Sequence, residues 1–270
     1  MNWIESLLYG LISGFTEFLP VSSAAHQILM EKLFGTEGNS SLRSLLVHFS
    51  LLAVLCYSCS SLLQEMNNRP AATRSGRRVV RRPPEVRLIR TAAIPLLLGF
   101  ALYPLVNSWV HNLILPTVFF VVNGMILFAP SRLASGNKDA RGMSGFDSIL
   151  IGLSGVLAVC PGISRVGSMT SVAIVRGAEK QQALNWSLLL SVPALVALIA
   201  FDVFAVISGG GLGSVAGILG YILSAAGAAI GGYFGIMLMR FLAVKTGFSG
   251  FAYYSWGAAL FSFILYLIVL

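Results

Sequence analysis

Long apolar stretches alternate with short polar ones along the whole chain, and this pattern predicts helices that cross a membrane. A membrane-spanning helix needs roughly 20 consecutive, mostly apolar residues. Six windows meet this requirement: about 42–64, 91–107, 114–131, 183–207, 213–239 and 250–270. Because these windows and their connections take up nearly all of the chain, we expect one membrane domain over residues 1–270, with halves at 1–131 and 132–270.

Two further segments, 1–41 and 146–181, are apolar at their ends but polar at their centres, where prolines interrupt them. Proline removes a backbone donor and clashes with the preceding helical turn. Irregular backbone at membrane depth is tolerated only inside protein or beside a water-filled cavity. We therefore predict that each segment is a re-entrant helical hairpin, which enters and leaves the membrane on the same side.

The basic residues predict on which side each connection lies. Between residues 69 and 90 there are eight arginines and a single acid, Glu85, and loops rich in Lys and Arg remain in the cytoplasm. Two other connections are basic and are assigned to the same side; they contain Arg132, Lys138, Arg141, Arg240 and Lys245. With these sides fixed, the first hairpin opens to the outside and the second to the cytoplasm.

The two halves also resemble each other in sequence. Residues 6–11 (SLLYGL) are similar to 148–153 (SILIGL), and 19–23 (LPVSS) are similar to 160–164 (CPGIS). The fold class is therefore an all-α integral membrane protein, with six transmembrane helices plus two re-entrant hairpins in an inverted repeat. This architecture has its binding site near the middle of the membrane, where helix N-termini direct N–H groups at an anion.

Composition narrows the possible partners. Charged residues make up only 10% of the chain, against about 25% in soluble domains, so the partner is the membrane. The net charge of +8 comes mainly from the basic loops, where no aromatic residues are interleaved, and we expect no nucleic acid partner. Three cysteines in apolar or proline-flanked positions are expected to be buried thiols: Cys56, Cys59 and Cys160.

Polar side chains at membrane depth are the candidates for function, because each is costly there. Arg165 has a planar, permanently charged fork that suits phosphate, and Glu17 with Ser23 and His26 offers acid–base and nucleophilic groups. The alternative is that Glu17 and Arg165 only lock the hairpins together while serines cap the broken helices. His48 and Asp202, isolated in apolar spans, are interpreted as interior residues that bond to neighbouring helices, with a role in the site as the alternative for Asp202.

Residues 14–26 (GFTEFLPVSSAAH) and 161–167 (PGISRVG) resemble the two signatures of the undecaprenyl-diphosphate phosphatase family, the bacitracin-resistance proteins. The resemblance covers the whole chain. It implies the fold predicted above and the cleavage of undecaprenyl diphosphate, a polyprenyl diphosphate lipid, into undecaprenyl phosphate and inorganic phosphate. In this family the reaction occurs at the outer face of the bacterial cytoplasmic membrane and recycles the carrier lipid for peptidoglycan synthesis.

The resemblance also assigns roles to residues. Glu17, Ser23 and His26 fall on catalytic positions, and a divalent cation (Mg²⁺ or Ca²⁺) is implied, with Glu17 as its ligand. Substrate contacts are expected from Ser13, Ser22, Ser164, Arg165, Ser168 and Thr170.

Three positions depart from the family pattern: Ser13 replaces an acid or amide, Val166 a serine and Met169 a threonine. A chain that lacks these groups could instead bind and flip the lipid phosphate as a transporter. The sequence does not fix the oligomeric state, and a homodimer is one of the states left open.

Overall fold

A computed structural model describes residues 2–35, 41–68, 84–107, 113–133, 136–210, 215–245 and 248–269. Within these ranges the chain is helical, and its only β-type pairing is an isolated bridge between Lys138 and Ala178. Five helices are long and apolar enough to cross a membrane: Ser41–Ser60, Ile114–Arg132, Lys180–Ser208, Gly217–Leu242 and Ser249–Ile268. The prediction of an all-helical, multi-spanning membrane protein is confirmed.

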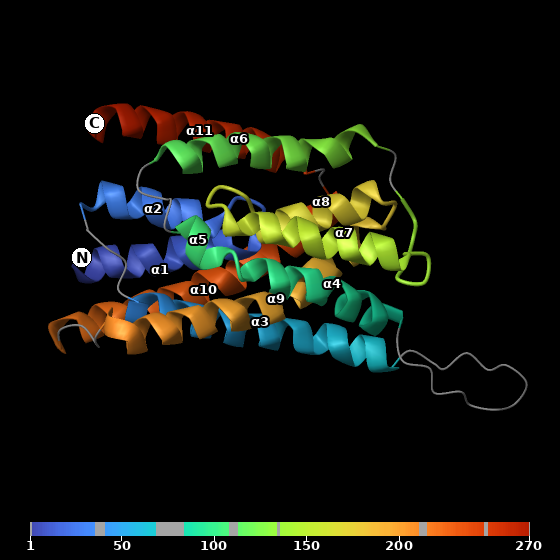
Figure 1. The fold of residues 1–270 in the computed structure, drawn as a ribbon, viewed down its shortest axis with the longest axis horizontal. Helices are drawn as coiled ribbons and strands as arrows, with labels where there is room; N and C mark the ends of the chain where they lie inside the picture. Colours follow the sequence, from blue (N-terminus) through green and yellow to red (C-terminus); the bar gives the residue numbers. More distant parts are fainter. Residues whose placement is uncertain are drawn as a thin grey trace, which may run out of the picture.

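The two broken segments each form a pair of helices joined by a short turn. The first pair is α1 (Trp3–Phe18) and α2 (Ser23–Leu33); the second is α7 (Gly145–Val156) and α8 (Arg165–Val175), with the short 3-10 helix η2 (Leu157–Val159) between them. Both α1 and α7 begin with a capping box, in which the cap residue and the third helical residue satisfy each other's backbone N–H. The first pair opens toward the end of the molecule that carries both termini, and the second toward the opposite end (Figure 1).

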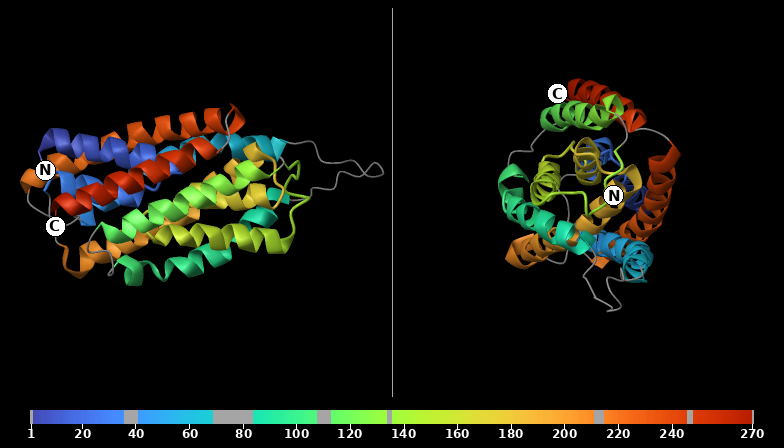
Figure 2. Two further views of the ribbon diagram at one scale, coloured as in Figure 1. Left: turned by 90° about the horizontal axis from the view of Figure 1, so that it is seen from above. Right: turned by 90° about the vertical axis from the view of Figure 1, so that its right-hand side faces the viewer.

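The other helices surround these pairs (Figure 2). In chain order they are α3 (Ser41–Asn68), α4 (Pro84–Phe100), α5 (Tyr103–Asn107), α6 (Ile114–Phe128), α9 (Lys180–Ala205), α10 (Val215–Lys245) and α11 (Ser249–Val269), with the single turns η1 (Ala129–Arg132) and η3 (Val206–Gly210). Helix α1 packs along α10, just as α7 packs along α4, and α6 pairs with α11.

The contact between α1 and α10 is close enough to require glycine. A Cβ atom at Gly14 would lie 2.2 Å from the carbonyl oxygen of Ala228 on α10, which is far inside contact distance. Small residues let two backbones approach in this way in membrane proteins. Gly231 of α10 lies equally close to α1, since a Cβ atom there would lie 2.2 Å from the Leu11 carbonyl oxygen.

One predicted span differs in the structure. The window 91–107 is not a single helix, because α4 ends at Phe100 and α5 starts at Tyr103. Pro104 explains the break: inside a continuous helix its ring would clash with the carbonyl of Phe100, four residues earlier, whereas in the first turn of a new helix it is tolerated.

Polar residues are enclosed and apolar residues face outward. Nearly every residue of α8 is buried, including Arg165 and three hydroxyl-bearing residues. Large apolar side chains on the outer helices are exposed, for example Leu98, Met125 and Phe234. An outer surface of this kind suits a bilayer, while the irregular turns of the hairpins are covered by protein.

Candidate active site

The turns of the two hairpins meet inside the bundle and are bonded to each other. The Ser22 hydroxyl oxygen accepts a hydrogen bond from the Gly162 N–H at 2.9 Å, and the Ser164 hydroxyl donates to the Leu19 carbonyl at 3.1 Å. The Ser164 oxygen also accepts from the Gly167 N–H and so caps the start of α8. These bonds hold the two hairpins together at their turns, where the backbone lacks regular helical hydrogen bonds.

Asn123 on α6 ties the two turns together from the side. Its amide nitrogen donates to the Pro20 carbonyl at 3.0 Å and to the Ser255 hydroxyl at 2.9 Å, and its amide oxygen accepts from the Ser164 N–H at 2.9 Å. Asn123 is fully buried, so these bonds satisfy groups that would otherwise be costly. Asn123 therefore bonds neighbouring helices and also shapes the site.

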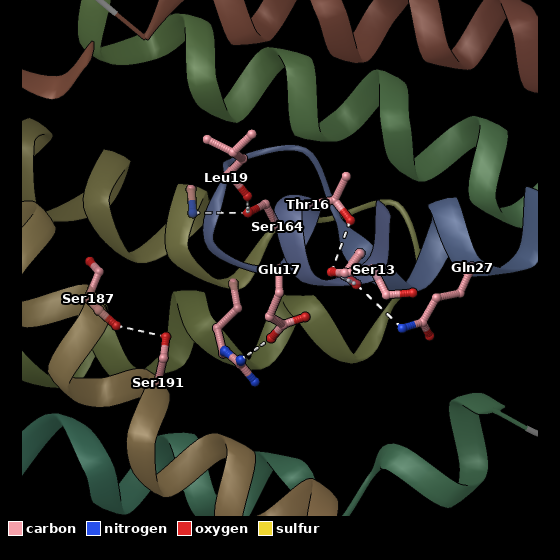
Figure 3. A network of polar contacts seen from close by, with 11 residues as sticks. Ser13, Thr16, Glu17, Leu19, Gln27, Ser164, Ser187 and Ser191 are labelled. Atoms are coloured by element: carbon pink, nitrogen blue, oxygen red, sulfur yellow. Dashed lines mark hydrogen bonds and ion pairs between the residues drawn. The ribbon is translucent and has the colours of Figure 1, made fainter. Parts of the chain in front are cut away.

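Glu17 from the end of α1 forms an ion pair with Arg165 from the start of α8 (Figure 3). The two side chains are 12% and 6% exposed. A buried charge without a partner destabilises a protein by several kcal/mol, so each charge makes the other tolerable. The pair therefore joins the two hairpins, as the sequence alternative of a lock between them also required.

The pair lies on the wall of a polar cavity of about 100 Å³. Five of the residues predicted from sequence line it: Glu17, Ser22, Ser23, Ser164 and Arg165. Helices α2 and α8 both begin at this cavity, and the N–H groups of a helix N-terminus attract anions. Charge, hydroxyls and helix ends together make the cavity suitable for phosphate oxygens.

Ser22 has an unusual backbone conformation, with φ of 65°. Such a value is uncommon for any residue except glycine and costs roughly 1–3 kcal/mol. Two bonds hold it in place: the one from Gly162 to its hydroxyl, and one from His26 Nδ1 to its carbonyl oxygen at 2.7 Å. The strained residue thus lies where the two hairpins meet.

His26 lies behind Ser22 and is not among the residues that line the cavity. A carbonyl oxygen can only accept, so His26 Nδ1 carries the proton, and Nε2 accepts from the Tyr254 hydroxyl at 2.8 Å. Tyr254 belongs to a separate apolar groove of about 590 Å³ between α1, α10 and α11. These contacts hold the turn, and the predicted role of His26 as a proton carrier stays a prediction.

Ser23 and Ser13 are neighbours on facing helices. The Ser23 hydroxyl donates to the Ser13 carbonyl at 2.9 Å, and Gln27 reaches the Ser23 oxygen from one turn further along α2 at 3.4 Å (Figure 3). The hydroxyl of Ser13 is buried and has no hydrogen-bond partner among the described residues. Ser13 therefore lies beside the site, and its hydroxyl makes no hydrogen bond to the described residues there.

Comparison with known proteins identifies the family of this chain. Residues 6–261 match the family described as bacitracin resistance protein BacA. The chain belongs to this family. It is 30% identical to the undecaprenyl-diphosphatase of Carboxydothermus hydrogenoformans, over 95% of this chain and 94% of that protein. It is also 30% identical to undecaprenyl-diphosphatase 1 of Shouchella clausii, over 98% and 96% of the two chains.

Besides Ser13, two further hydroxyls that were predicted to contact substrate do not line the cavity of this BacA-family protein. Ser168 donates to the Ser154 carbonyl at 2.8 Å, and Thr170 donates to the Ser187 hydroxyl at 3.0 Å. These bonds join α8 to α7 and α9. Val166 and Met169, which depart from the family pattern, are fully buried on the same helix. Substrate binding by Ser168 or Thr170 stays a prediction that these contacts do not support.

The cavity also contains residues that sequence reasoning did not select, notably His48, Tyr103 and Gln27. His48 and Asp202 had been assigned to separate interior bonds, but they bond to each other at 2.5 Å. A lone histidine in one apolar span and a lone acid in another are a signal for such a pair. Gln27 and Tyr103 gave no comparable signal, since nothing in the sequence indicates which way they face.

The described residues contain no group of three or more His, Cys, Asp or Glu side chains that could hold a metal ion. Glu17 is the only acid that lines the described part of the cavity. Mg²⁺ prefers oxygen ligands, and it is often bound by one or two carboxylates together with substrate phosphates and water. The residues present fit a cation only when a phosphate supplies further oxygens.

Proposed function

We propose that this BacA-family protein is an undecaprenyl-diphosphatase, which hydrolyses undecaprenyl diphosphate to undecaprenyl phosphate and inorganic phosphate and so recycles the carrier lipid for peptidoglycan synthesis. The observation that carries the proposal is the Glu17–Arg165 pair, one residue from each hairpin, on the wall of a polar cavity. The names of its relatives point to the same activity and make a transporter that cleaves nothing the weaker alternative.

A diphosphate brings several negative charges into a cavity whose own charges cancel. The guanidinium of Arg165 is able to bind two oxygens at once, and the starts of α2 and α8 each add a partial positive charge of about half a unit. The Ser22 hydroxyl, whose oxygen accepts from Gly162, still has its own proton to donate to a further phosphate oxygen. The hydroxyls of Ser23 and Ser164 donate to the Ser13 and Leu19 carbonyls and would have to exchange these acceptors for the phosphate. Fixed donors of this kind stabilise the charge that spreads over the oxygens during phosphoryl transfer.

Water is the nucleophile that the contacts favour. A serine nucleophile needs an adjacent base, but the Ser23 hydroxyl donates to the Ser13 carbonyl and meets no acid or base among the described residues. The carboxylate of Glu17 is placed to orient a water and to take its proton as the water oxygen bonds to the terminal phosphorus. The bond from that phosphorus to the bridging oxygen breaks, and the lipid leaves as undecaprenyl phosphate.

A divalent cation would be held by Glu17 together with the phosphates of the substrate. When bound, it supplies positive charge that neutralises the phosphate oxygens. Glu17 meets Arg165 through one carboxylate oxygen, so the second oxygen is available to such an ion. The Gln27 amide lies close by on the same wall.

The same proposal includes the placement in a bacterial cytoplasmic membrane. Counting α4 with α5 as one crossing gives six crossings, and the two hairpins then open to opposite sides. The matching contacts of α1 with α10 and of α7 with α4 support an inverted repeat. Ser44 and His48, in the first two turns of α3, place the cavity in the half of the bundle nearer the chain termini, which we assign to the outer side.

Phosphate release from a polyprenyl diphosphate by the purified protein in detergent tests the proposal. Arg165→Ala should lower the rate by about 100- to 1000-fold, because it removes an oxyanion donor. Arg176→Ala is the matched control: Arg176 forms an ion pair with Asp147 at 2.5 Å in the same hairpin but does not line the cavity. We expect this control to keep most of the activity.

Absence of phosphate release by the unsubstituted protein, with and without Mg²⁺ or Ca²⁺, would overturn the hydrolase proposal. Lipid phosphate binding without release would then support the transporter. If Arg165→Ala released phosphate as fast as Arg176→Ala, the Glu17–Arg165 pair would be a structural lock and not part of the active site.

A further inference from the structure

A second buried pair lies beside the cavity and has no part in the hydrolysis described above. His48 Nδ1 is 2.5 Å from Asp202 Oδ2, and the two side chains are 13% and 12% exposed. His48 is in the second turn of α3, and Asp202 is one turn before the end of α9. The pair therefore belongs to two long helices and not to either hairpin.

Only the histidine of this pair reaches the cavity. His48 lines the same wall as Glu17 and Arg165, whereas Asp202 does not line it and lies behind the imidazole. Since Nδ1 is bonded to Asp202, Nε2 is the ring nitrogen left for a ligand, and it has no hydrogen-bond partner among the described residues. A pair that only joined α3 to α9 would need no access to a polar cavity.

The chemistry of this arrangement suits an oxyanion. An imidazolium ring has two N–H donors and no acceptor. Asp202 accepts from Nδ1–H and fixes the ring's orientation, as carboxylates do for histidines that act on a ligand. A phosphate oxygen in the cavity would accept from Nε2–H, so that both donors are satisfied.

The position of His48 also complements the hairpin residues. Arg165, Ser164 and the helix starts all belong to the hairpin turns, whereas His48 lies on α3. A diphosphate has two phosphate groups, and donors from different elements of the wall allow each group to have its own contacts. Tyr103 on α5 lines the wall as well, and its ring packs against Phe201, the residue before Asp202.

We propose that His48 is a phosphate-binding residue of this site and that Asp202 is its positioning residue. The ligand is the terminal phosphate of a polyprenyl diphosphate, or the inorganic phosphate that it becomes. The identity of the lipid rests on the proposed function, but the binding of a phosphate does not.

The test compares His48→Ala, His48→Gln and Asp202→Asn in the full-length protein in detergent. Calorimetry measures the binding of farnesyl diphosphate and of inorganic phosphate, and a phosphate-release assay gives KM and kcat separately. Ser50→Ala is the matched control on α3, because the half-buried Ser50 only donates to the Val47 carbonyl and does not line the cavity. Thermal unfolding followed by circular dichroism verifies that each variant is folded.

We expect His48→Ala to weaken binding and raise KM by about 10- to 100-fold, the usual effect of losing a hydrogen bond to a charged group. His48→Gln keeps an N–H donor and should retain most of the affinity. The affinity of Asp202→Asn should lie between those of the two His48 variants. Ser50→Ala should not differ from the unsubstituted protein. Weaker binding of farnesyl diphosphate alone would assign the contact to the substrate, and weaker binding of both probes would extend it to the product.

Unchanged binding and KM in a folded His48→Ala variant would overturn the proposal and make the pair structural. A His48→Gln variant that bound normally but lost turnover would also overturn it, since His48 would then be a proton carrier. If the unsubstituted protein released no phosphate, the proposed function would fail, but the calorimetric comparison would still decide whether His48 binds phosphate.

Discussion

The ionisable side chains at the site are paired with each other, and a ligand is able to bind one member of each pair. Glu17 is paired with Arg165, and Asp202 is bonded to His48, which limits the cost of burying these side chains. Two of these four side chains, Arg165 and the proposed phosphate-binding residue His48, line the same cavity as Glu17. An entering phosphate would compete with the carboxylates for these two side chains, so the pairs stabilise the buried groups without closing the site to an anion.

Position 13 offers a prediction on single residues. Ser13 lies one helical turn before Glu17, and its hydroxyl has no hydrogen-bond partner among the described residues. We expect Ser13→Glu to supply a second carboxylate beside the proposed cation and to lower the Mg²⁺ concentration for half-maximal activity on the order of 10-fold, because charge count sets the affinity of such sites. Phosphate release is measured during Mg²⁺ titration after treatment with EDTA.

Ser13→Gln is the control, since the glutamine side chain has the size of glutamate but carries no charge. Equal Mg²⁺ requirements of the two variants would contradict the expectation. A protein whose activity is unaffected by EDTA would show that no cation is needed and would remove Glu17 from the role of metal ligand.

At the scale of elements, the geometry of the site depends on two turns that are held against α6. Gly162 has φ of 123°, and a Cβ atom there would lie 2.5 Å from Phe119 Cβ and 2.8 Å from the Pro116 carbonyl oxygen. Only glycine adopts such a conformation without strain and fits so close to another backbone. The N–H of Gly162 also donates to the Ser22 hydroxyl, so a shift of this glycine would displace residues of both hairpins.

Gly162→Ala should therefore lower stability by about 1–3 kcal/mol and reduce the rate of phosphate release, because the turn carrying Ser164 and Arg165 must move. Gly145→Ala is the matched control: Gly145 is the first residue of α7, and a Cβ there would meet nothing within 4 Å. Thermal unfolding in detergent compares the two variants. Equal melting temperatures and equal rates would show that the turn tolerates the side chain and does not hold the site.

The elements and the hairpin part of the site could be predicted from the sequence, because local patterns carry that information. Apolar length gives the long helices, and prolines with polar residues mark the two turns. Even the break at 101–102 was signalled by Pro104, although the apolar window extended across it. Contacts between distant helices carry no such local signal. His48 therefore could not be assigned to the cavity before the packing of α3 against α9 was known.

On the scale of the whole molecule, basic residues concentrate at one end of the bundle. Helices α4 and α7 both start at that end (Figure 1). Arg87 and Arg90 lie in the first two turns of α4, Arg132 ends η1, and Lys138 and Arg141 precede α7. At the opposite end, Arg43 is buried and lies 3.9 Å from Glu31. This asymmetry supports the proposed orientation, with the basic end in the cytoplasm and the cavity in the outer half of the membrane.

Cysteine labelling in intact bacteria tests this orientation. In a background with Cys56, Cys59 and Cys160 replaced by alanine, Leu33→Cys lies at the exposed end of α2 and Arg132→Cys at the exposed end of η1. A membrane-impermeant maleimide should label only Leu33→Cys, because the bilayer separates the reagent from the basic end. Permeabilised cells, in which both cysteines should react, serve as the control. Labelling of Arg132→Cys alone in intact cells would invert the orientation and move the cavity to the cytoplasmic half, where an enzyme acting on lipid diphosphate at the outer face could not have its site.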